Sequence, residues 1–308
     1  IKQQDTGWTD SFGYGAPYIN QGKIRNTGLE FAASWSDRLG DDLTFEVGGN
    51  FATLKNRVDE IDGNPNSFWA HTESWRGILN PYRSIVGQPL YSYWLIQNDG
   101  IFKSDAEAAA YTSAGGERIQ PNAKAGDLKF IDENKDGKID DGDRVFKGSA
   151  FPKITYGFTA SANWKNFDAS IFFQGIGGVK LFHAFKQSTL NGAEQGYNRW
   201  DKILDAWSET NMDSNIPVVQ ASDPNRNFAT NSDWYLENGN YLRLKNLVIG
   251  YTFKNMPGNS NLRVYVSGDN LLTFTKYSGM DPEVGGIGLD GGQFPVSRVY
   301  SVGLKLKF

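Results

Sequence analysis

Apolar and polar side chains alternate strictly along the last nine residues of the chain. Tyr300, Val302, Leu304, Leu306 and Phe308 are separated by serine, glycine and lysine. A period of two residues predicts a β-strand with one apolar and one polar face. Such a strand suits a soluble sandwich, but an aromatic residue at its end favours an outer-membrane β-barrel, whose apolar face meets lipid and whose polar face lines a wet interior.

The same alternation recurs along the rest of the chain. A tight turn at Lys165 and Asn166 has aromatic residues on both sides, as expected where a short hairpin meets a membrane interface. The apolar phase shifts between Leu244 and Leu247, which predicts a bulge near Asn246. With less regular patterns near 72–80 and 84–96, we count roughly nine strands by their length and alternation. The clear segments are 29–36, 43–51, 154–164, 167–173, 247–253, 262–266 and 296–308.

Long connections at 97–152, 176–240 and 274–295 are rich in Gly, Asn, Asp and Pro. They contain short helical patterns at Asp105–Tyr111 and Asp201–Trp207. Connections of this length are usually functional, and short turns at one end with long loops at the other are typical of outer-membrane proteins. We therefore predict an all-β fold: part of an antiparallel transmembrane β-barrel with long extracellular loops.

The amino-acid composition excludes several classes of protein. The 308 residues contain no Cys, which excludes a disulfide framework and thiolate metal sites. The net charge of −4 argues against a nucleic-acid partner, which would need a basic surface. No apolar run is long enough for a membrane-spanning helix. A mean hydropathy of −0.50 still suits a barrel, because only alternate residues of short strands meet lipid.

Residues 132–143 match the spacing of an EF-hand-type calcium loop. Oxygen-bearing side chains stand at positions 1, 3, 5, 9 and 12, and Gly137 at position 6 supplies the sharp turn. Position 7 would offer only a backbone carbonyl, and position 12 is Asp where Glu is usual. The alternative is a solvated turn without an ion; we favour a structural Ca²⁺ because clustered oxygens repel one another without a cation. The predicted ligand residues are Asp132, Asn134, Asp136, Lys138, Asp140 and Asp143.

Catalytic patterns are absent from the sequence. His71 and His183 have no carboxylate cluster at the spacing of metal ligands. The adjacent carboxylates of Asp59 and Glu60 are typical of a solvated turn and do not indicate the facing pair of a glycosidase. We predict a protein that is not an enzyme. Tryptophans in the loops are free to stack on a sugar ring or to pack inside the loops. The candidate substrate contacts are Trp200, Trp207 and Trp234.

A series of short motifs in a fixed order resembles a known family. It includes 26–30, 86–89, 98–102, 126–130, 152–158, 241–246, 268–273 and 277–283. Together these segments resemble the C-terminal third of SusC/RagA-like TonB-dependent transporters of the Bacteroidetes outer membrane, over essentially all of residues 1–308.

The resemblance implies a large barrel with an N-terminal plug, a SusD-like surface lipoprotein as partner, and import of an oligosaccharide or peptide with energy from the TonB complex. The plug and the early strands have no counterpart in this sequence, so we expect the chain to be one part of the barrel, with lipid around it. The alternatives are a soluble secreted β-sandwich or lectin-like module with a calcium-stiffened loop, and a surface glycosidase.

Overall fold

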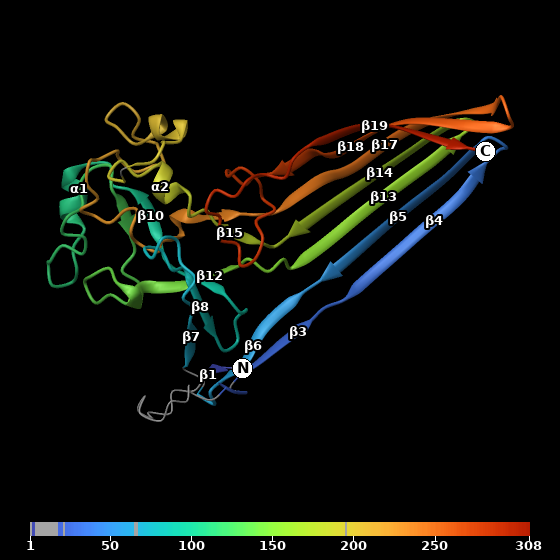
Figure 1. Ribbon diagram of the computed structural model, residues 1–308. Helices are drawn as coiled ribbons and strands as arrows, with labels where there is room; N and C mark the ends of the chain where they lie inside the picture. The colour runs from blue at the N-terminus through green and yellow to red at the C-terminus, as the bar shows by residue number, and fades with distance from the viewer. Residues whose placement is uncertain (1, 4–17, 21, 65–66, 195) are drawn as a thin grey trace, which may run out of the picture.

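The computed structural model describes residues 2–3, 18–20, 22–64, 67–194 and 196–308. Its main element is an antiparallel seven-stranded sheet with the order β19-β18-β17-β14-β13-β5-β4 (Figure 1). No described helix is long and apolar enough to cross a membrane. The strands of this large sheet are β4 (Glu30–Leu39), β5 (Leu43–Thr53), β13 (Ile154–Trp164), β14 (Phe167–Gly177), β17 (Tyr241–Met256), β18 (Ser260–Thr275) and β19 (Val299–Lys307).

The register of the large sheet places apolar side chains in continuous rows. One row runs across five strands from Trp35 through Val47, Ala160 and Ile171 to Leu247. Because successive residues of a strand point to opposite faces, these rows form a single apolar face. This apolar face is uncovered: Val302 is 77% exposed, and several aromatic side chains on it are more than half exposed.

Aromatic side chains concentrate at the end of this apolar face that carries the short turns. The rings of Phe167 and Tyr251 meet edge to face with 4.7 Å between centroids, and Tyr251 meets Phe253 at 4.8 Å. Trp164 lies next to Phe167 across the turn at Lys165. All three hairpin turns of the sheet lie at this end, and the long connections lie at the other (Figure 1).

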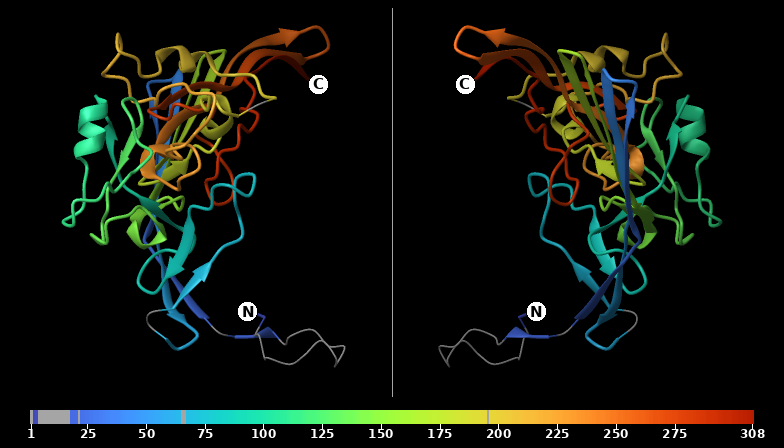
Figure 2. Two further views of the ribbon diagram at one scale, coloured as in Figure 1. Left: turned by 90° about the vertical axis from the view of Figure 1, so that its left-hand side faces the viewer. Right: turned by 90° about the vertical axis from the view of Figure 1, so that its right-hand side faces the viewer.

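The long connections fold together into an outer region at the far end of the sheet. Views at right angles show this region gathered beside the strand ends, with the β17–β18 hairpin bending away at its turn (Figure 2). Its largest sheet has the order β12-β9-β8-β7. Its elements are β7 (Phe68–Ala70), β8 (Tyr82–Ile85), β9 (Ser92–Ile96), β10 (Asn98–Ile101), α1 (Asp105–Ala110), β11 (Leu128–Phe130), η2 (Asp141–Asp143), β12 (Arg144–Ser149), β15 (Lys180–Phe182), α2 (Lys186–Thr189), η3 (Asp201–Asp205), η4 (Asp233–Tyr235) and β16 (Leu236–Asn238).

The buried hydrophobic clusters lie in the outer region and not in the large sheet. The largest cluster joins Tyr82 and Tyr93 of the small sheet to Phe182 of β15 and Tyr235 of η4. A second surrounds Phe130 and includes residues of β9, β10 and β11. The outer region is therefore a packed unit, whereas the large sheet has no hydrophobic core of its own among the described residues.

The pattern of apolar residues predicted most of the large sheet. β13 has the predicted bounds, and the strand register shifts between Leu244 and Asn246, where the bulge was predicted. The strand predicted at 72–80 is wrong, since only an isolated bridge between Trp75 and Leu79 forms there. The segment at 84–96 contains strands, but they belong to the small sheet. The alternation did not reveal β1 (Lys2–Gln3), β2 (Tyr18–Ile19), β3 (Gly22–Thr27) or β6 (Lys55–Ile61).

Two of the recognised motifs meet in space at the base of the outer region. Arg243 of β17, whose side chain is 2% exposed, pairs with Asp281 at 2.5 Å and with Glu283 at 3.0 Å. Lys245 pairs with Glu283 at 2.8 Å, but both of these side chains are more exposed. The motif 241–246 thus fixes the motif 277–283, and with it the loop between β18 and β19.

We predict that Arg243→Met loosens this loop. Removal of the buried guanidinium leaves Asp281 without its main partner, at a cost of about 3 kcal/mol. Lys245→Met is the matched control, because an exposed ion pair contributes less than about 1 kcal/mol. Limited proteolysis of the native protein should cut residues 276–298 faster in Arg243→Met than in Lys245→Met. Equal cutting rates would contradict a role for the buried pair.

Candidate functional site

The face of the large sheet opposite the apolar one is polar. Arg263 donates from Nε to Asp168 at 2.8 Å, and its second nitrogen contacts the other carboxylate oxygen. This pair crosses β17 above Gly250, where an added Cβ would lie 2.6 Å from the Asp168 carboxylate. Glu46, Ser161 and their neighbours continue the polar face across β5 and β13. Such a face offers hydrogen-bonding groups to water or to a polar solute.

A largely buried carboxylate joins two loops of the outer region. Glu237 of β16 accepts from His183 Nδ1 at 3.1 Å and pairs with Lys186 Nζ at 2.8 Å. The backbone N–H and the hydroxyl of Ser278, from the loop before β19, each donate to it at 2.8 Å. Four protein donors therefore surround this carboxylate, which ties the loop after β14 to the loop after β18.

The electrostatics of this cluster follow from its burial and its partners. Burial alone would raise the pKa of Glu237, but the hydrogen bond from His183 and the charge of Lys186 hold that pKa well below its usual range. Burial lowers the pKa of Lys186, although Glu237 opposes this effect. Lys186 also donates to the backbone oxygen of Trp234 at 3.1 Å and lies over the Trp234 ring. Both members of the ion pair thus have further hydrogen-bond partners.

The arrangement of Ser278, His183 and Glu237 does not form a proton relay. Ser278 Oγ and Glu237 Oε1 both approach the same ring nitrogen, His183 Nδ1, at 3.5 and 3.1 Å. A nucleophile–base–acid relay needs the hydroxyl and the carboxylate on different nitrogens of the imidazole. The sequence did not reveal this cluster, because its members lie far apart along the chain and share no local spacing.

The structure separates the three candidate tryptophans. Trp200 lines a cavity of about 390 Å³ together with His183, Phe185 and Met280. Trp207 is 7% exposed and belongs to the buried cluster around Phe130. Trp234 packs against three hydrophobic clusters, and its indole N–H donates to Asn215 at 2.7 Å. Trp207 and Trp234 have packing roles, and a substrate contact stays a prediction for all three.

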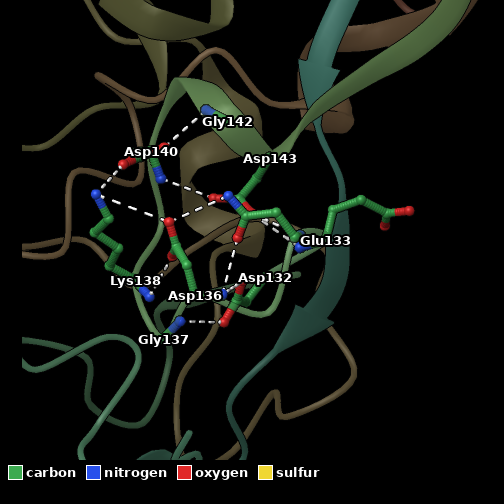
Figure 3. Close-up of polar contacts among 9 residues, drawn as sticks. Asp132, Glu133, Asp136, Gly137, Lys138, Asp140, Gly142 and Asp143 are labelled. Carbon is green, nitrogen blue, oxygen red and sulfur yellow. Dashed lines mark hydrogen bonds and ion pairs between the residues drawn. The ribbon is translucent and has the colours of Figure 1, made fainter.

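The predicted calcium loop folds through hydrogen bonds to its own backbone (Figure 3). The Asp132 carboxylate accepts from the N–H of Asp136 at 3.2 Å and of Gly137 at 2.8 Å. Gly137 has a φ of +90°, as the sharp turn at position 6 requires. Asp143 is 0% exposed and accepts from the N–H of Glu133 and of Asp140.

The Lys138 ammonium lies among the carboxylates of this loop. It is 2.7 Å from Asp140 and 3.8 Å from Asp136, so a side-chain cation already offsets part of their charge (Figure 3). The hydrogen bond from Lys138 lowers the pKa of Asp140. In the described part of the chain, no group of three or more His, Cys, Asp or Glu side chains is arranged to hold a metal ion. The residue types fit Ca²⁺, but Lys138 and Asp143 would have to reorient.

We predict that acid loosens the contact between the two loops. The stabilisation by Glu237 is fully present above the pKa of an unfolded Glu, about 4.3, and is lost as the pH falls through the lower folded-state pKa. Hydrogen exchange of residues 276–298 should therefore accelerate below about pH 4. In Glu237→Gln, exchange should be fast already at pH 7 and lack this component. A Gln variant with the same pH profile as the unaltered protein would contradict the assignment.

Comparisons with known proteins agree with the motifs. No family model matches the chain. The TonB-dependent receptor P3 of Formosa agariphila is 29% identical over 94% of this chain and 29% of its own length. The TonB-dependent receptor SusC of Bacteroides thetaiotaomicron is 24% identical over 94% of this chain and 27% of its own length. The chain therefore spans about 30% of the curated relatives that it matches.

Solved structures share the fold. The RagAB peptide importer in its open-open state matches with a TM-score of 0.74 and 24% identity, over 99% of this chain and 31% of the matched chain. A second structure of the RagAB peptide transporter matches with a TM-score of 0.72. The resemblance to SusC/RagA-like TonB-dependent transporters that the sequence motifs predict is therefore confirmed along nearly the whole chain.

Proposed function

We propose that this chain forms part of an outer-membrane β-barrel that imports a nutrient, an oligosaccharide or a peptide. The observation that carries the proposal is the uncovered apolar face of the large sheet, opposite a polar face. A SusD-like lipoprotein would cover the outer region, and the TonB complex would supply the energy. The curated relatives are receptors and not enzymes, which is consistent with a protein that makes and breaks no bonds.

The physical argument starts from the cost of exposed apolar surface. Each square ångström of apolar surface left in water costs roughly 25 cal/mol, and continuous rows of such residues cross the large sheet. Lipid would cover these rows, and the aromatic residues near the turns would lie at the membrane interface. Within the sheet the antiparallel ladders satisfy the backbone groups, which hydrocarbon requires.

The soluble β-sandwich alternative requires a second sheet on the apolar face. Packed sheets of a sandwich lie face to face, about 10 Å apart. The small sheet β12-β9-β8-β7 instead lies at the outer ends of the strands (Figure 1). No described element covers Trp35 or Val302, which are 59% and 77% exposed. The arrangement therefore favours a membrane protein over a secreted sandwich.

The test of this function is uptake by cells. We predict that Val302→Lys reduces nutrient uptake strongly, because a lysine at the bilayer midplane of a barrel costs about 2–4 kcal/mol. Ser301→Lys, on the polar face of the same strand, is the matched control and should retain uptake. Uptake of labelled oligosaccharide and peptide pools would be measured in cells with and without an active TonB complex, alongside the amount of folded protein in outer membranes.

Two outcomes would contradict the proposal. The first is recovery of the native protein from the soluble fraction. The second is uptake that is equal in cells with and without the TonB complex while the protein is folded and present. Equal loss in Val302→Lys and Ser301→Lys would contradict the assignment of the two faces.

We also propose that residues 132–143 bind a structural Ca²⁺. The support is the spacing of the oxygen-bearing side chains, the turn at Gly137 and the lysine that now offsets their charge. Asp132, Asn134, Asp136, Asp140 and a reoriented Asp143 would supply side-chain oxygens, and Lys138 its carbonyl. Bound Ca²⁺ would stiffen a loop of the outer region and would take no part in chemistry.

We predict that calcium chloride, added to native protein purified in chelator, protects residues 132–143 from proteolysis. A ligand at 100 times its dissociation constant stabilises by about 2.7 kcal/mol. Asp132→Asn/Asp136→Asn should abolish the protection, and Lys138→Met should bind Ca²⁺ more tightly because the competing cation is gone. Asp41→Asn/Asp213→Asn, at exposed sites elsewhere, is the matched control. Protection that persists in the loop variant would contradict this site.

A further inference from the structure

A cavity of about 390 Å³ lies between the segment that follows β15 and the loop before β19. Its walls are mostly apolar, and Phe185, Trp200 and Met280 supply most of their large side chains. Its volume falls in the range of sites that hold small ligands, about 300–1,000 Å³. The loop of residues 132–143 contributes no residue to it, so this cavity is separate from the proposed calcium site.

One nitrogen of a buried imidazole opens into this cavity without a partner. His183 is 1% exposed, and its Nδ1 approaches the Glu237 carboxylate at 3.1 Å. Because an ionised carboxylate only accepts, Nδ1 carries a proton, and Nε2 of the neutral ring is an acceptor. Nε2 has no hydrogen-bond partner among the described residues, and it is not closed off from the surrounding space. Since His183 lines the cavity, Nε2 is the atom that a ligand would meet there.

A cation in the lining of this cavity has no counter-ion. The half-buried Arg199 donates from Nη1 to the backbone oxygen of Ser188 at 2.7 Å, which fixes the guanidinium beside the cavity. It makes no ion pair with any residue in the described part of the chain. Its remaining N–H groups are therefore free to bind a carboxylate, for which the guanidinium has a matching two-pronged geometry.

The other polar side chains of the lining already make hydrogen bonds, apart from that of the exposed Asn198. Asp290 is 3% exposed, and its carboxylate accepts from the Tyr277 hydroxyl and from two backbone N–H groups of its own loop. The hydroxyls of Ser278 and Thr189 each donate to a protein oxygen at 2.8 Å. The buried part of the cavity thus offers a ligand one unpartnered nitrogen, the imidazole Nε2, and the guanidinium lies beside it.

Backbone contacts hold the walls of the cavity in place. The N–H of Phe185 donates to the backbone oxygen of Asp290 at 3.0 Å. A Cβ added to Gly292, whose φ is +85°, would lie 2.7 Å from the Phe185 ring, so this ring packs directly against the main chain. The Trp200 ring meets the His183 ring edge to face, with 5.8 Å between centroids. Walls that are fixed in this way lose little conformational freedom when a ligand binds.

These features favour one class of ligand. A sugar ring or a peptide backbone carries several donors and acceptors, and each one left unpaired against an apolar wall costs free energy. A flat aromatic ring instead gains contact with the aromatic walls. We propose that this cavity binds a small hydroxylated aromatic carboxylate. Its ring lies against Trp200 and Phe185, its hydroxyl donates to His183 Nε2, and its carboxylate binds Arg199.

This site goes beyond the import function, because binding needs neither transport nor a membrane. The test is equilibrium binding to the whole native protein at about pH 8, where an ordinary imidazole is neutral. The probe is 4-hydroxyphenylacetate. Phenylacetate lacks the hydroxyl donor, and 4-hydroxyphenylacetamide lacks the charge. We expect the probe to bind roughly tenfold tighter than each control, because hydrogen bonds to charged groups are the strong ones. A probe that binds no tighter than the two controls would overturn the ligand class.

Two variants test the two polar contacts. Arg199→Gln should weaken binding of the probe by roughly tenfold and leave binding of the amide control unchanged, because only the probe is charged. His183→Asn keeps a donor for Glu237 but has no acceptor in place of Nε2, so it should remove the preference for the probe over phenylacetate. Arg38→Gln removes an equal charge at an exposed site outside the cavity and should bind like the unaltered protein.

Three outcomes separate the possible failures. Equal probe binding by Arg199→Gln and Arg38→Gln would overturn this cavity as the binding site. A preference for the probe over phenylacetate that persists in His183→Asn would overturn the contact with Nε2. Loss of nutrient uptake with intact probe binding would contradict the import function and leave this site standing.

Discussion

The antiparallel hydrogen-bond ladder is the interaction on which the rest of this molecule depends. β13 pairs with β5 and with β14 along its whole length, so the backbone groups of the central strands are satisfied inside the sheet. The backbone hydrogen bonds of the sheet therefore need no protein layer over either face. Side chains on the two faces are then free to suit two different surroundings, and the register alone keeps each residue on its own face.

The outer region differs from the large sheet, because it has a hydrophobic core and many buried polar groups. The charged groups there have hydrogen-bonding partners. The largely buried Glu237 pairs with Lys186 and accepts from Ser278 of another loop, and the buried Arg243 pairs with Asp281. The buried Asp143 accepts from backbone N–H groups of its own loop. Without these partners, each of these charged groups would carry the full free-energy penalty of its removal from water. The loops are thus held in one arrangement by polar complementarity as well as by hydrophobic packing. A surface of this kind is suited to binding a partner or a solute without large rearrangement.

The sequence predicted what depends on local periodicity and missed what depends on distant contacts. Alternation located β13 and β14, and a phase shift located the bulge near Asn246. The sequence pattern did not predict β3 and β6, because charged and apolar residues mix in Lys23–Arg25 and Lys55–Val58 without a regular period. The EF-hand spacing is visible in sequence, but the ammonium of Lys138 among its carboxylates is not. Glu237 and His183 are 54 residues apart, and only the paired strands β15 and β16 bring them together.

The clusters of the outer region have a consequence for the order of folding. Tyr93, Phe182 and Tyr235 meet in one cluster although they lie in connections on either side of the β13–β14 hairpin. Closing such long loops is entropically unfavourable before the intervening strands have paired. The hairpins, whose contacts are local, should form first and bring the connections to one end of the sheet. The outer region should therefore fold only after the strands have paired. A defect in strand pairing would leave the aromatic residues of the outer region exposed to solvent, where they promote aggregation.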